Sequence, residues 1–508
     1  MSGPWLPILT LLPLAGAVVV ACLPKGADVL AKLVAIGWSL VALVLTIIIC
    51  VGFDPDGDRF QYVTSYPWIS QFGTRLAFGV DGIALVMLAL VGVLTPIVLL
   101  ASWNDANDPR RSVKTYYALM LALQTCMIGV FVATDVFFFY VFFEAMLVPM
   151  YFLIGSYGGP QRQYAAVKFF LYSLVGGLFM LASVIGLYVV SSHQLGTGTF
   201  DFQKLAGLDL ATSTGRWIWL GFFIAFAVKA PLFPFHTWLP DAGAQAPIGA
   251  AVLLVGVLDK VGTFGFLRYN LPLFPEASRF FAPVVIVLGI IGILYAALLA
   301  IGQKDMKRLV AYTSVAHFGF IAIGVFAFTS QGGSGAVLYM VNHGIATGAL
   351  FLVVGFLIAR RGSALIADYG GAGKIVPWIY GAFFITGMAS LALPLTNSFV
   401  SEFLVLLGVF SRNPVAGVLA TLGIVVAALY VLWMIQRTMH GPLNPTLPKM
   451  RDLTGREAWV IVPLLVLILG LGVYPKPLLD VINPAVQATL HDVGKSDPQP
   501  TEVAGGNR

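Results

Sequence analysis

The chain has 508 residues, of which 59% are hydrophobic and only 10% are charged. A soluble protein of this length needs far more charged surface, so the composition excludes a soluble enzyme or binding domain. The formal net charge of +6 does not indicate a nucleic-acid partner, because Lys and Arg residues are needed to orient membrane helices. We therefore expect the lipid bilayer to be the solvent of most of the chain.

Apolar stretches of about 20 residues recur along the sequence, and an α-helix of that length crosses a hydrocarbon core of about 30 Å. They predict an all-α membrane protein with about 14 transmembrane helices. The predicted spans are residues 5–23, 30–52, 80–101, 115–133, 135–155, 167–192, 216–236, 246–268, 281–302, 307–329, 335–360, 376–411 with a break, 415–436 and 457–475.

The basic residues predict the orientation of these spans. An even number of spans puts both termini on one side of the membrane. Of the 29 Lys and Arg residues, sixteen fall in loops opposite the termini, ten fall on the side of the termini and three fall inside spans. Because basic loops favour the cytoplasm, both termini are predicted on the non-cytoplasmic side. The three basic residues inside spans are Lys168, Lys229 and Lys260.

Two spans are interrupted by proline. The seventh contains Pro231 and Pro234, and the twelfth contains Pro394. Since proline lacks an N–H and clashes with the preceding turn, neither span is expected to be one unbroken helix. Breaks five spans apart predict two inverted five-helix repeats, each with a broken helix beside an ion path. The predicted domains are 1–112 (spans one to three), 113–270 (first repeat), 280–440 (second, inverted repeat), 441–490 (last span) and 491–508 (disordered tail).

Four ionisable side chains lie where the spans cross the hydrocarbon: Glu144, Lys229, Lys260 and Glu402. Left charged and unpaired, each costs about 2.5 to 3.5 kcal/mol, or about 10 to 14 kcal/mol together. They must therefore pair, lose their charge or line water. A structural ion pair between Glu144 and Lys229 is one interpretation, and a proton path is the one that we favour.

The size of the interaction suggests how such a pair moves a proton. An ammonium about 4 Å from a carboxylate gains about 4 kcal/mol at an effective dielectric constant near 20, and about half as much at 8 Å. A helix movement of a few ångströms at Glu144 and Lys229 therefore suffices to load or release a proton. An ammonium cannot ligate sodium, which needs several oxygen ligands, so lysines favour protons over sodium.

Further candidates surround these four residues. His236, His317 and His343 can relay protons near neutral pH. The alternatives for them are hydrogen-bonded core histidines or a bis-histidine haem on spans ten and eleven. Lys168, near the start of span six, either joins the path or extends to the interface. Asp259 projects about 100° away from Lys260 on an ideal helix, which favours a different partner.

Lys307 and Arg308 enter span ten from a loop, and we expect them to anchor the topology. The cysteines Cys22, Cys50 and Cys126 show no CxxC spacing, which argues against an iron–sulfur cluster or a disulfide framework.

Several motifs within about residues 80 to 440 resemble one family. The chain is similar there to the antiporter-like subunits of respiratory complex I (the proton-translocating NADH:quinone oxidoreductase), of Mrp antiporters and of membrane hydrogenases. The motifs are Phe-Glu-x-x-x-x-Pro at Glu144, Lys-Ala-Pro-Leu-Phe-Pro-Phe-His-Thr-Trp-Leu-Pro-Asp at 229–241, the span of Lys260, Lys-Arg-Leu-Val-Ala-Tyr-Thr-Ser at 307–314, His-Gly at 343 and Phe-Val-Ser-Glu-Phe at 399–403.

The resemblance implies roles for particular residues. It implies Glu144 and Lys229 as a coupled pair, Lys260 as the central relay residue, His317 and His343 as connectors, and residue 402 as the end of the path. Most relatives carry Lys at that last position. The M-type (mitochondrial subunit 4 type) branch carries Glu, as this chain does at Glu402. The absence of a long extra C-terminal helix also favours the M type over the L type.

The resemblance also implies the setting. It implies proton translocation by a membrane-arm subunit of complex I in the bacterial cytoplasmic membrane, beside neighbouring antiporter-like subunits. No cofactor is expected in this chain, and flavin, iron–sulfur clusters and quinone are expected in partner subunits. The chain departs from the family at Gly243 and Gln245, where a His and a Glu are common, and at Leu395 and Asn397, where glycines are common.

Other functions remain open at this point. A close alternative is a subunit of an Mrp-type cation/proton antiporter or of a membrane hydrogenase. A cytochrome-like redox protein and a purely structural membrane scaffold are the alternatives from other classes.

Overall fold

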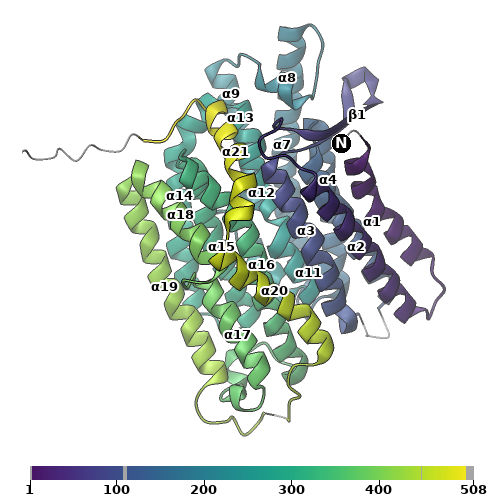
Figure 1. Cartoon of the computed structure of the whole chain (residues 1–508), viewed down its shortest axis with the longest axis vertical. Helices are drawn as coiled ribbons and strands as arrows, with labels where there is room; N and C mark the ends of the chain where they lie inside the picture. Colours follow the sequence, from purple (N-terminus) through teal and green to yellow (C-terminus); the bar gives the residue numbers. More distant parts are fainter. Residues whose placement is uncertain (1–2, 107–110, 448, 499–508) are drawn as a thin grey trace, which may run out of the picture.

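The computed structural model describes residues 3–106, 111–447 and 449–498. Long helices run side by side through most of the molecule, and the first helix begins at the same end at which the last helix lies (Figure 1). The regular elements are α1 (Trp5–Cys22), α2 (Asp28–Val51), β1 (Gln61–Ile69), β2 (Thr74–Val80), α3 (Gly82–Ala101), α4 (Val113–Val132), α5 (Val136–Ala145), α6 (Leu147–Tyr157), α7 (Arg162–Leu195), α8 (Phe202–Ala206), α9 (Thr212–Lys229), α10 (Trp238–Gln245), α11 (Ile248–Leu253), α12 (Lys260–Gly265), α13 (Leu271–Leu273), α14 (Pro275–Ile301), α15 (Met306–Phe326), α16 (Ser330–Arg361), α17 (Pro377–Ser390), α18 (Asn397–Arg412), α19 (Pro414–Met439), α20 (Gly455–Val473) and α21 (Lys476–Asp492). Two π-helical turns, η3 (Leu254–Leu258) and η4 (Phe266–Asn270), join α11, α12 and α13 into one helix.

The described chain has 12 helices that are long and apolar enough to cross a membrane, with α5 and α6 counted as one span and α11 to α13 as another. The two predicted spans outside this set are the seventh and the twelfth. The structure breaks the first of them between α9 and α10 and the second between α17 and α18. The prediction of an all-α membrane fold with a broken helix in each half is therefore confirmed.

Each break is stabilised by local bonds to the groups that it frees. At the first, Leu232 N–H donates to the Ala227 carbonyl at 2.9 Å and the Trp238 indole N–H donates to the Val228 carbonyl at 2.9 Å. At the second, Leu393 N–H donates to the Met388 carbonyl at 3.0 Å, and Ala392 and Leu395 adopt left-handed conformations, with φ of 58° and 76°. Residues other than glycine adopt this region at a cost.

The centre of the bundle is formed by helices that are buried on every side. Every residue in the most apolar 18-residue stretch of α11 to α13 is buried, and so are 94% of the residues in the corresponding stretches of α15 and α16. In contrast, less than half of the corresponding stretch is buried in α1, α2, α7, α14, α19 and α20. The ionisable residues of α12, α15 and α16 therefore lie in the interior of the bundle.

Two elements were not predicted from the sequence. The strands β1 and β2 form an antiparallel hairpin between the second and third helices, and α21 follows the last span and packs against α3, α13 and α16. At the end of α21, Asp492 pairs with Arg59 at 2.6 Å. Of the tail that was predicted to be disordered, residues 491–498 make defined contacts, among them Arg412 to the Ser496 carbonyl at 2.6 Å. Residues 499–508 lie outside the described part.

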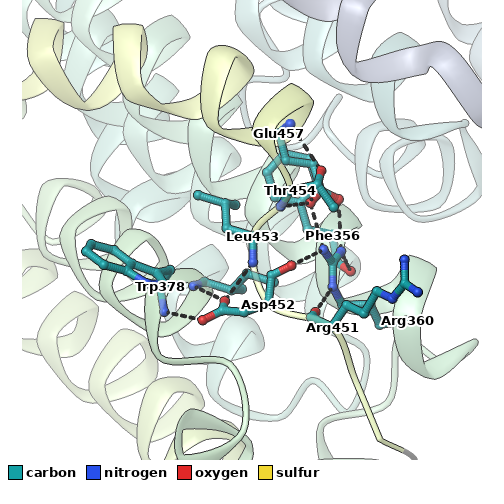
Figure 2. A network of polar contacts seen from close by, with 9 residues as sticks. Phe356, Arg360, Trp378, Arg451, Asp452, Leu453, Thr454 and Glu457 are labelled. Carbon is teal, nitrogen blue, oxygen red and sulfur yellow. Dashed lines mark hydrogen bonds and ion pairs between the residues drawn. The ribbon is translucent and has the colours of Figure 1, made fainter.

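A cluster of polar contacts fixes α20 to the ends of α16 and α17 (Figure 2). The Arg360 guanidinium binds both Glu457 carboxylate oxygens, at 2.9 and 2.6 Å. Its remaining N–H groups donate to the carbonyls of Phe356, Arg451 and Asp452. The Asp452 carboxylate accepts the N–H groups of Trp378 and Ile379 at the start of α17, where an anion is stabilised by the exposed N–H groups of the first turn.

We expect Arg360→Met to lower the free energy of unfolding by about 3 kcal/mol, because it leaves the largely buried Glu457 carboxylate without its partner. Thermal unfolding of the purified complex that contains the chain measures this loss. Arg361→Met is the matched control, since Arg361 binds the Asp368 carbonyl and the Thr446 hydroxyl and has no carboxylate partner among the described residues. Equal losses in the two variants would contradict a special role for the pair, and Arg360→Met/Glu457→Leu should recover most of the stability.

Candidate functional site

Glu144 and Lys229 face one another from two helix ends. Glu144 lies in the last turn of α5, and Lys229 is the last residue of α9 and is 1% exposed. Within the described residues, neither Glu144 Oε1 nor Lys229 Nζ has a hydrogen-bond partner. The two groups still interact electrostatically. The Lys229 ammonium lies 5.0 Å from the ring centre of Phe143 and 5.7 Å from that of Phe169, so aromatic faces provide part of its solvation.

A glycine makes room for the Glu144 carboxylate. A Cβ on Gly177 of α7 would overlap Glu144 Oε1, whereas a Cβ on the adjacent Gly176 would lie 3.3 Å from Ala225 Cα. The Glu144 side chain therefore reaches its position only because residue 177 has no side chain. The pair that the sequence predicted is close but open in this structure.

The Lys260 ammonium has three acceptors and no exposure to solvent. Its Nζ lies 3.1 Å from Asp259 Oδ1 and 2.6 Å from His343 Nδ1, and it also donates to the Val255 carbonyl. Three acceptors match the three N–H bonds of an ammonium. This arrangement requires a neutral His343 whose proton is on Nε2, and that nitrogen lies 3.2 Å from Ser314 Oγ.

The π-helical turn η3 explains why a backbone acceptor is present. The Asp259 N–H donates to the Leu254 carbonyl, five residues earlier, at 3.2 Å. In an α-helix it would donate to the Val255 carbonyl instead. The wider turn therefore leaves the Val255 carbonyl accessible to Lys260. The expectation that Asp259 serves a different partner was wrong, because it assumed ideal helical geometry at this position.

Two further groups continue the row from His343 across α15 and α16. The His317 ring centre lies 5.2 Å from that of His343 and 5.6 Å from that of Tyr339. His317 also interacts with the backbone carbonyl of Ser390, the last residue before the second helix break. The predicted connectors are thus brought together, and they lead from Lys260 to the broken helix.

Glu402 lies beyond that break, on α18, and is 5% exposed. It interacts electrostatically with Tyr339 and Tyr430. Asn342, the neighbour of His343, donates to the Asn397 carbonyl at 2.7 Å, and Asn397 donates back to the Asn342 carbonyl at 3.2 Å. This pair of hydrogen bonds between α16 and α18 holds the helix of Glu402 beside the histidines.

Lys168 belongs to a second cluster, which lies toward the membrane face opposite the termini. Its ammonium pairs with Asp241 at 2.7 Å, and Arg308 pairs with the other oxygen of the same carboxylate at 2.6 Å. Asp241 thus joins α7, α10 and α15. His236 lies in the break before α10, is 2% exposed and interacts electrostatically with Lys168. Lys168 is therefore an ion-pair partner rather than a free side chain at the interface.

A pocket of about 430 Å³ opens on the same face of the molecule. Asp105, Asp305, Lys307 and Gln245 are among its lining residues. Lys307 is 8% exposed and donates to the Ala246 carbonyl at 2.6 Å, so it does not act only as a surface anchor. Asp105 lies in the loop after α3, and burial raises the pKa of its carboxyl.

The sequence did not single out Asp241 or Gly177. Asp241 ends the proline-rich motif that begins at Lys229, and it was counted as part of the motif rather than as a charge. Gly177 was one of two adjacent glycines in a long apolar span. Among the described residues, no three His, Cys, Asp or Glu side chains converge as a metal site would require.

Comparisons with known proteins agree with this arrangement. Residues 133–427 match the model of the family "NADH:quinone oxidoreductase/Mrp antiporter, TM". The chain is 49% identical over 534 residues to NADH-quinone oxidoreductase subunit M of Mycobacterium tuberculosis, with 98% of this chain and 96% of the relative covered. It is 38% identical over 480 residues to NADH-ubiquinone oxidoreductase chain 4 of Arabidopsis thaliana, with 94% and 95% covered.

Solved structures give the same result for the fold. A chain of respiratory complex I from Thermus thermophilus superposes with a TM-score of 0.87 at 30% identity, covering 96% of this chain and 100% of that one. A chain of the Mrp complex from a Dietzia species has a TM-score of 0.84 at 21% identity, covering 96% and 99%, which is a likeness of fold alone. The chain belongs to the NADH:quinone oxidoreductase/Mrp antiporter family of transmembrane proteins.

Proposed function

We propose that the chain translocates protons across the membrane as the M-type subunit of an NADH:quinone oxidoreductase. The observation that carries this proposal is the row of titratable side chains, which are buried except for the half-buried Glu144. The row begins at Glu144 and Lys229, continues through Lys260, His343 and His317, and ends at Glu402. Because ionisable groups in hydrocarbon are costly, a connected series of them is retained for transport rather than for packing.

The proposed order of transfer follows the helices. A proton held between Glu144 and Lys229 passes to Lys260, since α12 lies against the end of α9. The two helices are so close there that a Cβ on Gly262 of α12 would overlap the Phe226 carbonyl of α9. From Lys260 it passes to His343 Nδ1, whose ring can release a proton from Nε2. His317 and the Tyr339 region then lead to Glu402.

We assign proton entry to the face opposite the termini. Lys168, Asp241 and Arg308 place charged groups at this end of α7, α10 and α15, with His236 in the adjacent break. With the excess of basic residues on the same face, this makes it the cytoplasmic side and puts both termini outside the cytoplasm. The bacterial cytoplasmic membrane is the proposed location.

The redox chemistry is assigned to partner subunits. We propose that flavin, iron–sulfur clusters and quinone are bound there, and that this chain contributes a path whose proton affinity changes as neighbouring antiporter-like subunits move. The two halves, residues 113–270 and 280–440, are proposed to be inverted repeats. Each contains a broken helix, α9/α10 in the first and α17/α18 in the second.

An Mrp-type cation/proton antiporter subunit is the second candidate, since a chain of an Mrp complex shares the fold. Two observations favour the first candidate. The relatives at 49% and 40% identity are NADH-quinone oxidoreductase subunits, and the central groups Lys229 and Lys260 are ammonium groups, which cannot ligate an alkali cation. Copurification with NADH-oxidising subunits, rather than with Na⁺ or K⁺ exchange subunits, distinguishes the two candidates.

We expect Glu144→Gln and Lys229→Ala each to lower NADH-driven proton pumping about tenfold, which corresponds to about 1.4 kcal/mol of barrier. Each variant removes a proton-binding group and leaves the helices intact. Quenching of a pH-sensitive dye in inverted membrane vesicles measures pumping, and native gels measure assembly. Lys204→Ala and Glu276→Gln, on exposed or partly exposed sites of the terminal face, are the matched controls. Full pumping by an assembled Lys229→Ala complex would favour the structural-scaffold alternative.

Gly177→Ala should reduce pumping several-fold without changing a titratable residue. The added methyl group occupies the position of Glu144 Oε1 and displaces the carboxylate from Lys229. Gly186→Ala is the matched control on the same helix, because its added methyl group would lie 3.4 Å from the Ile218 side chain, an ordinary van der Waals contact, so it should pump normally. The same vesicle assay compares the two, and equal activities would remove the positional requirement at Glu144.

A further inference from the structure

Asp259 is a buried carboxylate for which the path described above has no use. It is 0% exposed, its Oδ1 lies 3.1 Å from Lys260 Nζ, and its Oδ2 has no hydrogen-bond partner among the described residues. A lone carboxylate in this environment is unfavourable unless an opposite charge or a proton compensates it. Oδ1 therefore faces the Lys260 ammonium, from which it can take up a proton, and Oδ2 remains without a partner.

The charged groups around Asp259 are few. Its own helix provides Lys260 and, further along, Arg268, which is paired with Asp81. Helix α16 provides His343 and α15 provides His317. Lys229 ends α9, which packs against α12, and its electrostatic partner is Glu144. In the described residues, α3 has no charged side chain, and α4 has only Lys114, at its exposed end, and the neutral Gln124 in its interior. Asp259 is therefore the carboxylate that compensates the charge of Lys260.

The number of protons in this pair follows from the charges. With one transferable proton, the pair is either ammonium and carboxylate or amine and carboxylic acid, and both forms are neutral overall. The two forms interconvert when the Lys260 Nζ–H bond breaks and an Asp259 Oδ1–H bond forms, along a contact of 3.1 Å. Removal of this last proton would leave a single negative charge in the hydrocarbon. The resting pair therefore retains it.

Resting on the proton-translocation function proposed above, we infer that Asp259 is a second proton carrier at the central lysine. At rest the pair holds one proton, which either residue can bind. A second proton arriving from Lys229 binds the Lys260 amine while the first remains on Asp259. Lys260 then passes one proton to His343 Nδ1, its Nζ–H bond breaking as the Nδ1–H bond forms. The pair returns to its one-proton state, so every step conserves protons and charge.

Asp259→Asn tests the inference, because an amide keeps the shape of the carboxyl but cannot take up the proton. We expect an assembled Asp259→Asn complex to pump several-fold more slowly and to show a displaced pH profile, since the amine and ammonium of Lys260 lose their carboxylate. Asp259→Glu, which restores a carboxyl, should recover most of the activity and the parent pH profile. Asp209→Asn, in an exposed loop of the terminal face, is the matched control.

A spectroscopic readout separates a carrier from a merely structural residue. In redox-induced infrared difference spectra of the whole complex, a protonated carboxylic acid has its own C=O stretching band. Labelling aspartate with ¹³C should shift such a band in the parent complex and in Asp209→Asn, but not in Asp259→Glu. This comparison does not depend on whether Asp259→Asn assembles. A parent spectrum without a label-sensitive carboxylic acid band would overturn the inference.

Failure of the inference can be told from failure of the proposed function. Normal pumping and a parent pH profile in Asp259→Asn, together with the loss of pumping in Lys229→Ala, would remove Asp259 from the path and leave the function in place. Normal pumping in both variants would remove the function as well.

Discussion

Water cannot reach most of this protein, so every ionised side chain inside it must find its solvation in the protein. The structure meets this need differently at each place. Arg268 pairs with Asp81 at 2.7 Å, with both side chains 2% exposed. Lys260 has three acceptors, whereas Lys229 has the faces of two aromatic rings. A charged group with few contacts depends strongly on each of them, because one added or lost contact is a large part of its total electrostatic stabilisation. A small movement can therefore change the protonation state of the groups with the poorest solvation.

Irregular helical segments supply much of this solvation. The π-helical turn before Lys260 exposes the Val255 carbonyl, and the second helix break lets the Asn397 carbonyl at the start of α18 accept a hydrogen bond from Asn342. A regular helix would have used both carbonyls internally. Departures from regularity are tolerated at membrane depth where protein surrounds them, and the helices that carry them lie against the buried helices α15 and α16. The fold thus places backbone acceptors where the ionisable side chains need them.

The sequence predicted what depends on local composition. The length of the apolar stretches predicted the spans, because it follows directly from the thickness of the bilayer. Pro231, Pro234 and Pro394 predicted both breaks, because a proline disrupts the turn that precedes it. The hairpin of β1 and β2 and the helix α21 were missed because their stability comes from contacts such as Arg59 with Asp492, which are far apart in the sequence. The same reason hid Asp241 as the common partner of Lys168 and Arg308. The contact between Asp259 and Lys260 was missed because the flexible Lys260 side chain reaches back to Asp259 Oδ1 and to the Val255 carbonyl of the preceding π-helical turn.

The two lysines suggest where the path is controlled. Lys260 is fixed by three acceptors, so its environment changes little unless the helix itself is rearranged. Lys229 has no hydrogen-bonded partner in the described residues, and the carboxylate that faces it is only half-buried, on α5 beside the largely exposed α7. A movement of α5 or α7 therefore changes the charge balance at Lys229 while that at Lys260 stays constant. In the path proposed above, this asymmetry favours control of proton movement at Glu144, followed by transfer toward the better-solvated Lys260.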